Sequence, residues 1–152
     1  MRALVQRVSS AQVEFDDRVV GKTGRGLLVY LGVGLADTIE HVDRLAEKIA
    51  HLRIFRDDQG EMNLSAMDVE GDILVIPNFT LMADTRKGRR PSFAAAAPPD
   101  VAEPIYEKLI ESLKSYGGHV AGGAFGRRMV IRSVADGPVN ALVEYPLPEK
   151  PS

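Results

Sequence analysis

Cysteine is absent from the 152-residue sequence. Disulfide bonds, thiolate nucleophiles and cysteine-based zinc sites are thereby excluded, and a reducing compartment such as the cytoplasm is the expected location. Histidine is also scarce: the three histidines, His41, His51 and His119, lack the spacing of metal ligands. We therefore expect no metal ion, and because the sequence contains neither a Walker loop nor a dinucleotide fingerprint, we expect no other cofactor.

Long apolar runs are missing as well. The longest, residues 26–36, is interrupted by three glycines and is too short to span a bilayer. Arg2, Gln6 and Arg7 stand at the start of the chain with no long apolar region behind them. The sequence therefore predicts no signal peptide and no membrane partner.

Positive charge does not predominate, because 19 lysines and arginines face 21 aspartates and glutamates, for a net charge of −2. A protein that coats nucleic acid generally needs a positive surface. DNA is therefore not an expected partner, and any contact with RNA must be local.

The order of apolar patterns predicts a single mixed α+β domain over residues 1–146, followed by a loose, proline-containing tail at 147–152. Asp37 and Glu40 have the spacing of a capping box, which predicts the start of a first helix. A second helix is expected from Asp100 onward. Runs of strand character occupy residues 2–9, 11–15, 18–21, 27–33, 72–76, 129–134 and 141–145.

Two of the expected strands, 27–33 and 72–76, are apolar at all or nearly all positions, which is typical of strands buried on both faces of a sheet. The second of them is followed by Asn78, Phe79 and Thr80. These residues offer an amide, a flat ring on which a base could stack, and a hydroxyl. The alternative is a strand that leaves the core, with Phe79 as a core residue and Asn78 as a cap.

Residues 135–140 (Ala-Asp-Gly-Pro-Val-Asn) lie between the last two expected strands. Pro138 has no N–H and a fixed φ, so it cannot take part in a central strand ladder. Gly137 can adopt backbone angles that other residues avoid. The pair therefore forms either a hairpin turn or a deliberately exposed backbone feature.

Cations gather in the loop at 84–93. Arg86, Lys87, Arg89 and Arg90 face the single acid Asp84, a local net charge of +3 in a chain that totals −2. Guanidinium groups suit phosphates, which makes the loop a candidate anion contact. The alternative is a solvated charged loop.

Glycines are frequent at 122–129, where they allow close approach of the backbone to a ligand. Phe125 and Met129 belong to this segment, as do two further arginines, Arg127 and Arg128. The alternative is a flexible hairpin. Nowhere does the sequence supply an evident acid–base pair, since no HExxH motif, Walker loop or Gly-x-Ser-x-Gly elbow is present.

Several segments match one known family in the same order along almost the whole chain. The combination resembles the D-aminoacyl-tRNA deacylases of the bacterial and eukaryotic type, although each piece alone is weak. The matching segments are residues 1–8, 26–29, 31–33, 53–55, 62–64, 79–81, 83–84, 90–93 and 136–139.

The resemblance implies a compact, β-rich α+β domain with a barrel-like sheet and two main helices, which works as a homodimer. It further implies a hydrolase that cleaves the ester between a D-amino acid, or glycine, and the terminal adenosine of tRNA. The tRNA 2′-hydroxyl would assist the chemistry, which would account for the missing protein base.

The resemblance also assigns roles to residues. Gly137-Pro138, with Val139 beside it, would be a cis pair that enters the partner's active site and excludes an L side chain, while Arg7 braces it. Asn78, Phe79 and Thr80 would form the catalytic pocket around the adenosine, and Phe125 and Met129 would contact the substrate. From its charge, not from the resemblance, we expect the basic loop of Arg86, Lys87, Arg89 and Arg90 to bind tRNA.

This sequence departs from the family pattern at four positions. The family usually has serine and glutamine where this chain has Pro77 and Asn78, alanine in place of Arg127, and threonine in place of Asn140. Two other functions therefore stay open. One is a deacylase of relaxed chirality that clears mischarged tRNA, and the other is a non-catalytic dimeric module that binds an RNA 3′-end or adenosine.

Overall fold

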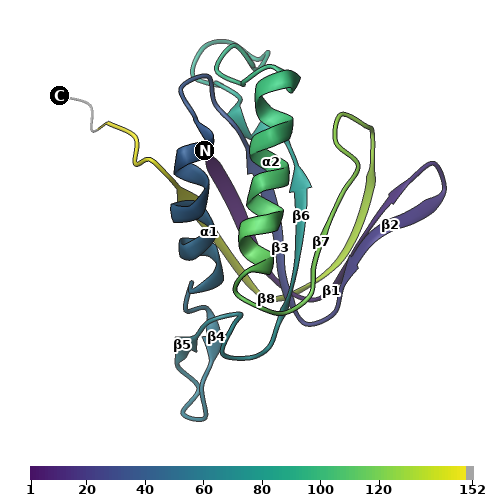
Figure 1. Ribbon diagram of the computed structural model, residues 1–152, viewed down its shortest axis with the longest axis vertical. Coiled ribbons are helices and arrows are strands. Elements are labelled where there is room, and N and C mark those ends of the chain that lie inside the picture. Colours follow the sequence, from purple (N-terminus) through teal and green to yellow (C-terminus); the bar gives the residue numbers. More distant parts are fainter. Residues whose placement is uncertain (150–152) are drawn as a thin grey trace.

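A computed structural model describes residues 1–149, which form a curved, barrel-like six-stranded sheet with two helices packed on one side (Figure 1). The α+β class expected from the sequence is thus confirmed. The sheet contains β1 (Arg2–Phe15), β2 (Arg18–Thr23), β3 (Gly26–Gly32), β6 (Asp72–Pro77), β7 (Val120–Gly122) and β8 (Val130–Glu144). The helices are α1 (Val42–Ala50) and α2 (Pro99–Lys114), with short 3₁₀ segments η1 (Ile39–His41) and η2 (Phe79–Met82). A separate hairpin, β4 (Phe55–Arg56) and β5 (Met62–Leu64), protrudes at the bottom of Figure 1.

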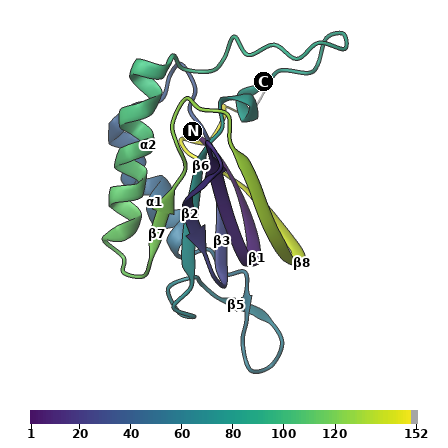
Figure 2. The same ribbon diagram turned by 90° about the vertical axis from the view of Figure 1, so that its right-hand side faces the viewer.

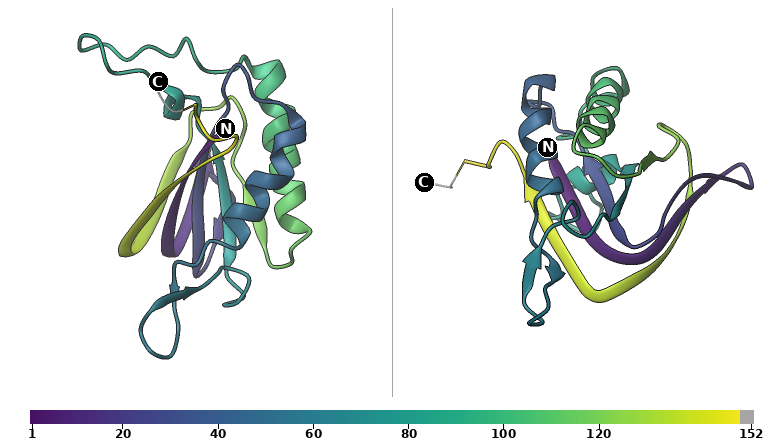
Figure 3. Two further views of the ribbon diagram at one scale, coloured as in Figure 1. Left: turned by 90° about the vertical axis from the view of Figure 1, so that its left-hand side faces the viewer. Right: turned by 60° about the horizontal axis from the view of Figure 1, so that its bottom comes forward.

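β1 is the central strand of the sheet. One of its edges pairs with β8 from end to end, and its other edge pairs first with β3 and then with β2, all antiparallel. The sequence predicted two strands at 2–9 and 11–15, but they are one continuous strand. Figure 3 shows how β1 and β8 bend together, which curves the sheet.

β3 and β6 pair in parallel in the middle of the sheet and are buried on both faces, as their apolar runs predicted. Alternate side chains therefore serve two different cores. Leu27, Val29 and Val75 face α1 and α2, whereas Leu28 and Leu74 belong to a second cluster. Figure 2 shows both helices on one side of the sheet. The second cluster also contains residues of β1, Val8, Ala11 and Val13.

The predicted capping box at Asp37 and Glu40 is wrong. Neither Asp37 nor the observed N-cap residue Thr38 makes a side-chain capping bond. The Asp37 carboxylate instead accepts hydrogen bonds from the α-amino group of Met1 (2.5 Å) and the Gly34 N–H (2.6 Å). A buried ammonium–carboxylate pair thus replaced the local bond that the spacing suggested.

A hairpin turn at Gly137-Pro138 is also wrong. β8 runs through this pair as one strand, and it pairs with β1 on both sides of it, at Gln6↔Asn140 and Val8↔Ala135. Residues 136–139 therefore bulge out of the ladder opposite Arg7. Within residues 1–149, β8 has only β1 as a ladder partner, so the proline lies on an edge strand, where a missing N–H is tolerated.

The chain after Pro146 leaves the sheet, and Leu147 is exposed. Of the tail expected at 147–152, residues 150–152 lie outside the described part. No helix within residues 1–149 has the length and apolar character needed to cross a membrane.

Candidate active site

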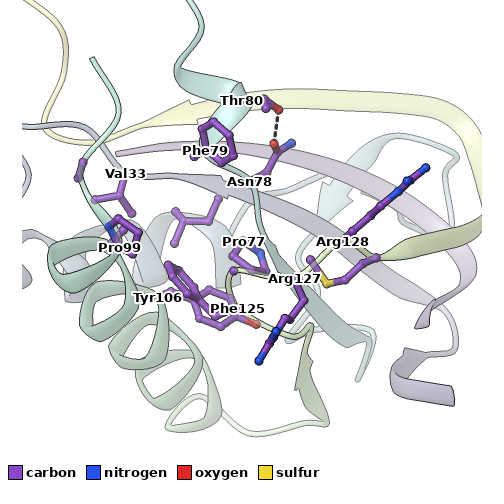
Figure 4. A pocket seen from close by; sticks show the side chains of 15 residues that line it. Val33, Pro77, Asn78, Phe79, Thr80, Pro99, Tyr106, Phe125, Arg127 and Arg128 are labelled. Atoms are coloured by element: carbon purple, nitrogen blue, oxygen red, sulfur yellow. Dashed lines mark hydrogen bonds between the residues drawn. The ribbon is translucent and has the colours of Figure 1, made fainter. Parts of the chain in front are cut away.

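A cleft of about 690 Å³ lies between the end of β6, helix α2 and the segment that leads into β8 (Figure 4). Its walls are mostly apolar, and its polar groups come from the strand end and from the 122–129 segment. Drug-sized ligands occupy pockets of this size and character. The residues that line it are Leu31, Val33, Pro77, Asn78, Phe79, Thr80, Ala97, Pro99, Ala102, Tyr106, Phe125, Gly126, Arg127, Arg128 and Met129.

The end of β6 supplies the polar side of the cleft. The Asn78 N–H donates to the Leu31 carbonyl (2.8 Å), which continues the pairing with β3 by one residue. The Thr80 hydroxyl donates to Asn78 Oδ1 (2.5 Å), so the Asn78 amide keeps its N–H donors for a ligand. Pro77 also lines the cleft and has no N–H to offer there.

Phe79 is 59% exposed, so it is not a core residue. The alternative in which the strand leaves the core and Phe79 packs inside is therefore wrong. Its ring meets that of Phe93 edge to face at 5.3 Å between centroids. Phe93 lies within the long segment between η2 and α2. The exposed ring is therefore held in place at the mouth of the cleft, where it can stack on a base.

Tyr106 is a cleft residue that the sequence did not single out. Its hydroxyl lies 3.0 Å from the Val75 carbonyl and 3.3 Å from the Gly123 carbonyl, both of which can accept its hydrogen bond. Burial raises the pKa of Tyr106 to about 12, so the phenol remains a donor at neutral pH. On an amphipathic helix such a tyrosine is indistinguishable from a core residue, and no local signal reveals its partners.

The 122–129 segment forms the third wall. It is not a hairpin, because β7 pairs with β6 whereas β8 pairs with β1. The Phe125 ring lies 5.8 Å from that of Tyr106, and the Ala124 N–H donates to the Met129 sulfur (3.3 Å). Gly126 has a φ of +69°, which turns the chain and brings Arg127 and Arg128 to the rim.

Gly137, Pro138, Val139 and Arg7 do not line the cleft of their own chain. The Gly137–Pro138 peptide bond is cis, and both residues are exposed. Arg7 is 5% exposed; its Nε donates to the Asp136 carbonyl (3.2 Å) and its Nη1 to the Ile54 carbonyl (2.6 Å). The structure therefore separates the predicted site residues into a cleft and an outward-facing bulge.

The basic loop is also outside the cleft, on the extended segment that runs from η2 to α2 along the top of Figure 2. The backbones of Asp84 and Ser92 form an antiparallel β-bridge at the base of this loop. The Arg86 guanidinium donates two hydrogen bonds to the Asp84 carboxylate (2.9 and 2.6 Å), which holds the pKa of that carboxyl well below its usual range. Lys87, Arg89 and Arg90 are exposed and form no ion pair within residues 1–149.

Three of the four departures from the family pattern, Pro77, Asn78 and Arg127, line the cleft. The fourth, Asn140, pairs with Gln6 where the bulge rejoins the ladder. Within the described residues, no cluster of histidine, aspartate and glutamate has the arrangement of a metal site. The cleft therefore offers orientation and hydrogen bonding, through an amide, a hydroxyl and two guanidinium groups.

Comparison with known sequences gives full-length matches. The family model described as D-Tyr-tRNA(Tyr) deacylase matches residues 4–144. A D-aminoacyl-tRNA deacylase of Roseiflexus castenholzii is 50% identical, over 99% of this chain and 96% of the relative. One from Thermosipho africanus is 49% identical, over 95% of this chain and 97% of the relative.

Comparison with solved structures gives two further similarities. A protein described as "c-Myc DNA Unwinding Element Binding Protein" superposes with a TM-score of 0.91 at 36% identity, over 97% of this chain and all (100%) of that one. A structure described as that of a probable eukaryotic D-amino acid tRNA deacylase has a TM-score of 0.79 at 21% identity, over 93% of this chain and 97% of that one. The second similarity concerns the fold alone.

Proposed function

Since the chain belongs to the D-Tyr-tRNA(Tyr) deacylase family and is a D-aminoacyl-tRNA deacylase, we propose how it recognises and cleaves its substrate. The cleft holds the terminal adenosine of the tRNA together with the esterified D-amino acid, and glycyl-tRNA is a second substrate. The observation that carries this proposal is the cleft itself, whose apolar walls end in the amide and hydroxyl of Asn78 and Thr80.

The aromatic and apolar surface of the cleft suits the adenine ring of the terminal nucleotide. Phe79 stands exposed at the mouth, and the rings of Phe125 and Tyr106 form one wall. A purine stacked on such rings gains about 1–3 kcal/mol by comparison with other base–aromatic contacts. The ribose and the ester would then lie toward Asn78 and Thr80, whose polar atoms fix their orientation.

Hydrolysis proceeds without a protein base. No histidine lines the cleft, and Tyr106 is a neutral donor committed to backbone carbonyls. The neighbouring 2′-hydroxyl of the terminal ribose can act within the substrate, so the protein contributes positioning and hydrogen bonds to the developing oxyanion. Well-placed donors of this kind contribute about 2.7–4 kcal/mol in other hydrolases.

Chiral selection is assigned to the bulge of a second subunit. Gly137 and Pro138 face outward, away from the cleft of their own chain. β8 carries three exposed apolar side chains, Val130, Val134 and Leu142, which a second copy would cover. In the homodimer, the bulge of one subunit forms a rigid backbone wall over the partner's cleft, which rejects L side chains by steric clash.

The remaining parts of the proposal concern the whole chain. Residues 1–146 act as one deacylase domain, and the cytoplasm, where tRNA is charged, is the location that suits a tRNA substrate. Lys87, Arg89 and Arg90 contact tRNA phosphates outside the cleft. Because the chain carries a net charge of −2, this contact is weak and sensitive to salt.

The direct test is release of labelled amino acid from D-Tyr-tRNA, Gly-tRNA and L-Tyr-tRNA by the purified protein. We expect hydrolysis of the first two and not of the third. Release of L-tyrosine at a comparable rate would instead support the relaxed-chirality deacylase. A protein that binds a non-hydrolysable aminoacyl-adenosine mimic but releases no amino acid would be the non-catalytic module, and Pro77→Ser with Asn78→Gln should then restore turnover.

One similar structure is described as a DNA unwinding element binding protein, which makes duplex DNA a specific competitor to test against tRNA. Duplex DNA presents a dense, regular array of phosphates, which a chain of net charge −2 is poorly suited to coat. We expect an excess of duplex DNA to leave the deacylation of D-Tyr-tRNA unchanged. Strong inhibition would show that DNA and tRNA share a surface.

A further inference from the structure

Two cations on the rim of the cleft have no part in the chemistry described above. Arg127 and Arg128 both line the cleft and are exposed. Among the ion pairs formed within residues 1–149, none includes either guanidinium. The rim of a largely apolar cleft therefore carries two uncompensated positive charges, in a chain whose net charge is −2.

The next arginine along the chain, in contrast, is paired with an acid. Arg132, a few residues along on β8, donates to the Glu14 carboxylate at 3.0 Å. The same hydrogen bond and charge help to lower the pKa of Glu14, after the bond from Gln12. The absence of an acid beside Arg127 and Arg128 is therefore a local property of the cleft rim.

Arg127 is held in a definite position. Its guanidinium carbon lies 5.7 Å from the centroid of the Phe15 ring, at the end of β1. A guanidinium stacked on an aromatic face keeps its in-plane N–H donors free at its edge. Phe15 thus orients the group while leaving its hydrogen-bonding edge available to an anion.

The two side chains do not converge on one point. In Figure 4, Arg127 and Arg128 leave the loop in different directions, Arg128 toward the upper right and Arg127 toward the bottom of the view. A single small anion would not engage both groups in this arrangement. Two anionic groups spaced along a chain would, and a single-stranded RNA end carries one phosphate for each nucleotide.

We propose that Arg127 and Arg128 bind backbone phosphates of the RNA 3′-end whose terminal adenosine lies in the cleft. This inference rests on the proposed function, which places that adenosine there. The first phosphodiester leaves the ribose at the cleft mouth, where guanidinium groups form strong, charge-assisted hydrogen bonds to phosphate oxygens. The pair thus holds the 3′-end in register with Asn78 and Thr80.

The test uses ligands that carry no amino acid, so that binding is measured apart from hydrolysis. The probes are the trinucleotide CCA, which has internucleotide phosphates, and adenosine, which has none. For the double variant Arg127→Gln/Arg128→Gln we expect CCA to bind about tenfold more weakly at low salt, with adenosine affinity changed less than twofold. The slope of log K against log salt should fall by about 0.7 for each phosphate that the variant no longer binds.

Arg132→Gln is the control, because it removes a positive charge of the same region from outside the cleft, one where the double variant removes two. It should leave both affinities within twofold. Equal weakening of CCA binding in the control and the double variant would overturn the proposal. It would show that CCA responds only to the overall positive potential of the region. Circular dichroism would establish that each variant is folded.

Two results separate this inference from the proposed function. CCA binding that depends on the two arginines, in a protein that releases no amino acid, would uphold the phosphate contact and reject the deacylase activity. Normal deacylation by a double variant with unchanged CCA affinity would uphold the deacylase activity and reject the phosphate contact. A preference for D-Asp over D-Asn esters that disappears in the double variant, with CCA binding intact, would assign the arginines to the amino acid's carboxylate and overturn the proposal.

Discussion

The guanidinium of Arg7 donates a hydrogen bond to the backbone carbonyl of Asp136, the residue immediately before Gly137-Pro138. The same Nε lies 3.2 Å from the Asp136 carboxylate, and Nη1 donates to the Ile54 carbonyl at 2.6 Å. One buried cation thus ties the outward bulge of β8 to β1 and to the segment before β4. The conformation of the bulge is therefore set by contacts distant in sequence.

Arg7→Lys should loosen this bulge. A lysine carries a compact charge and cannot reproduce the fork that reaches both carbonyl groups. One buried carbonyl loses its partner, and we expect the free energy of unfolding to fall by about 2 kcal/mol. Urea unfolding measures this, with Arg2→Lys as the control. Arg2 is about a third exposed (35%) and contacts the Glu144 carboxylate and the Leu81 carbonyl, where water can replace it, so its replacement should cost less than about 1 kcal/mol.

The functional effect of Arg7→Lys should be on selectivity. If the bulge is the chiral wall, a mobile bulge admits L-amino acids, so the ratio of D-Tyr-tRNA to L-Tyr-tRNA hydrolysis should drop at least tenfold. A variant that is destabilised but keeps the wild-type ratio would contradict the assigned bracing role.

Gly137→Ala should lower the free energy of unfolding more than Gly60→Ala does. Gly137 has a φ of +133°, and a Cβ there would lie 2.8 Å from the Val139 nitrogen. Gly60 has a φ of +82° but nothing within 4 Å of its Cβ position. We expect Gly60→Ala to cost about 1 kcal/mol from backbone strain alone, and Gly137→Ala more than about 2 kcal/mol. Thermal unfolding compares the two, and equal costs would contradict the steric explanation.

Mixing of two defective variants, one that should lose selectivity and one that should lose activity, tests whether the bulge acts on the partner's cleft. One variant carries Gly137→Ala and the other Asn78→Ala. In a heterodimer formed by denaturing and refolding the two together, one of the two sites would combine an intact cleft with an intact bulge. We expect selective hydrolysis of D-Tyr-tRNA to return to about a quarter of the wild-type level, because half of the dimers are mixed and each has one good site. No recovery would place cleft and bulge in the same subunit.

Tyr106→Phe should have an effect that depends on pH. At neutral pH the loss of the bond to the Val75 carbonyl should cost about 1 kcal/mol. The pKa of Tyr106 is raised to about 12, so between pH 10 and about pH 12 the unfolded chain releases this proton while the folded protein keeps it. Wild-type stability therefore falls with rising pH by up to about 1.4 kcal/mol per pH unit through this group.

The phenylalanine variant lacks that contribution. Its stability deficit relative to the wild type should therefore shrink, and approach zero, when unfolding is measured at about pH 11 instead of pH 7. All other tyrosines are common to the two proteins and cancel. A deficit that stays constant over this range would show that the phenol is not shielded from water.

Removal of Arg89 and Arg90 should weaken tRNA binding at low salt, with a reduction shared by many tRNAs, because phosphates carry no sequence information. Arg86→Ala provides the comparison. Arg86 is also exposed, but it is already engaged by the Asp84 carboxylate, so its removal should matter less than that of Arg89 or Arg90. Filter binding at several salt concentrations measures the three variants, and an equal effect of Arg86→Ala would contradict the role of the ion pair.

The sequence predicted the middle of the sheet well and its functional edges poorly. β3 and β6 were recognisable because a strand buried on both faces must be apolar at every position, which is a local property. The cap at Asp37 was mispredicted because a short spacing rule ignores Met1, which lies far away in sequence and competes for the same carboxylate.

The site was predictable only in part, for the same reason. Asn78 and Thr80 follow a strand end, so their place in a cleft could be anticipated from the chain. Tyr106 could not be distinguished from a core residue, because its partners belong to other elements. The bulge at Pro138 required knowledge that β8 is an edge strand and that Arg7 lies opposite, neither of which local propensity contains.

The position of β1 between early and late strands has a consequence for synthesis. β2 and β3 end by Gly32 and can pair with β1 soon after they leave the ribosome, whereas Arg2 and its partner Glu144 stand 142 residues apart. Closing so long a loop is slow, and until β8 emerges β1 presents a whole free edge to other chains. A nascent chain stalled before β8 would therefore be prone to aggregate, and demand for chaperones should be greatest for chains interrupted in the last fifteen codons of the sheet.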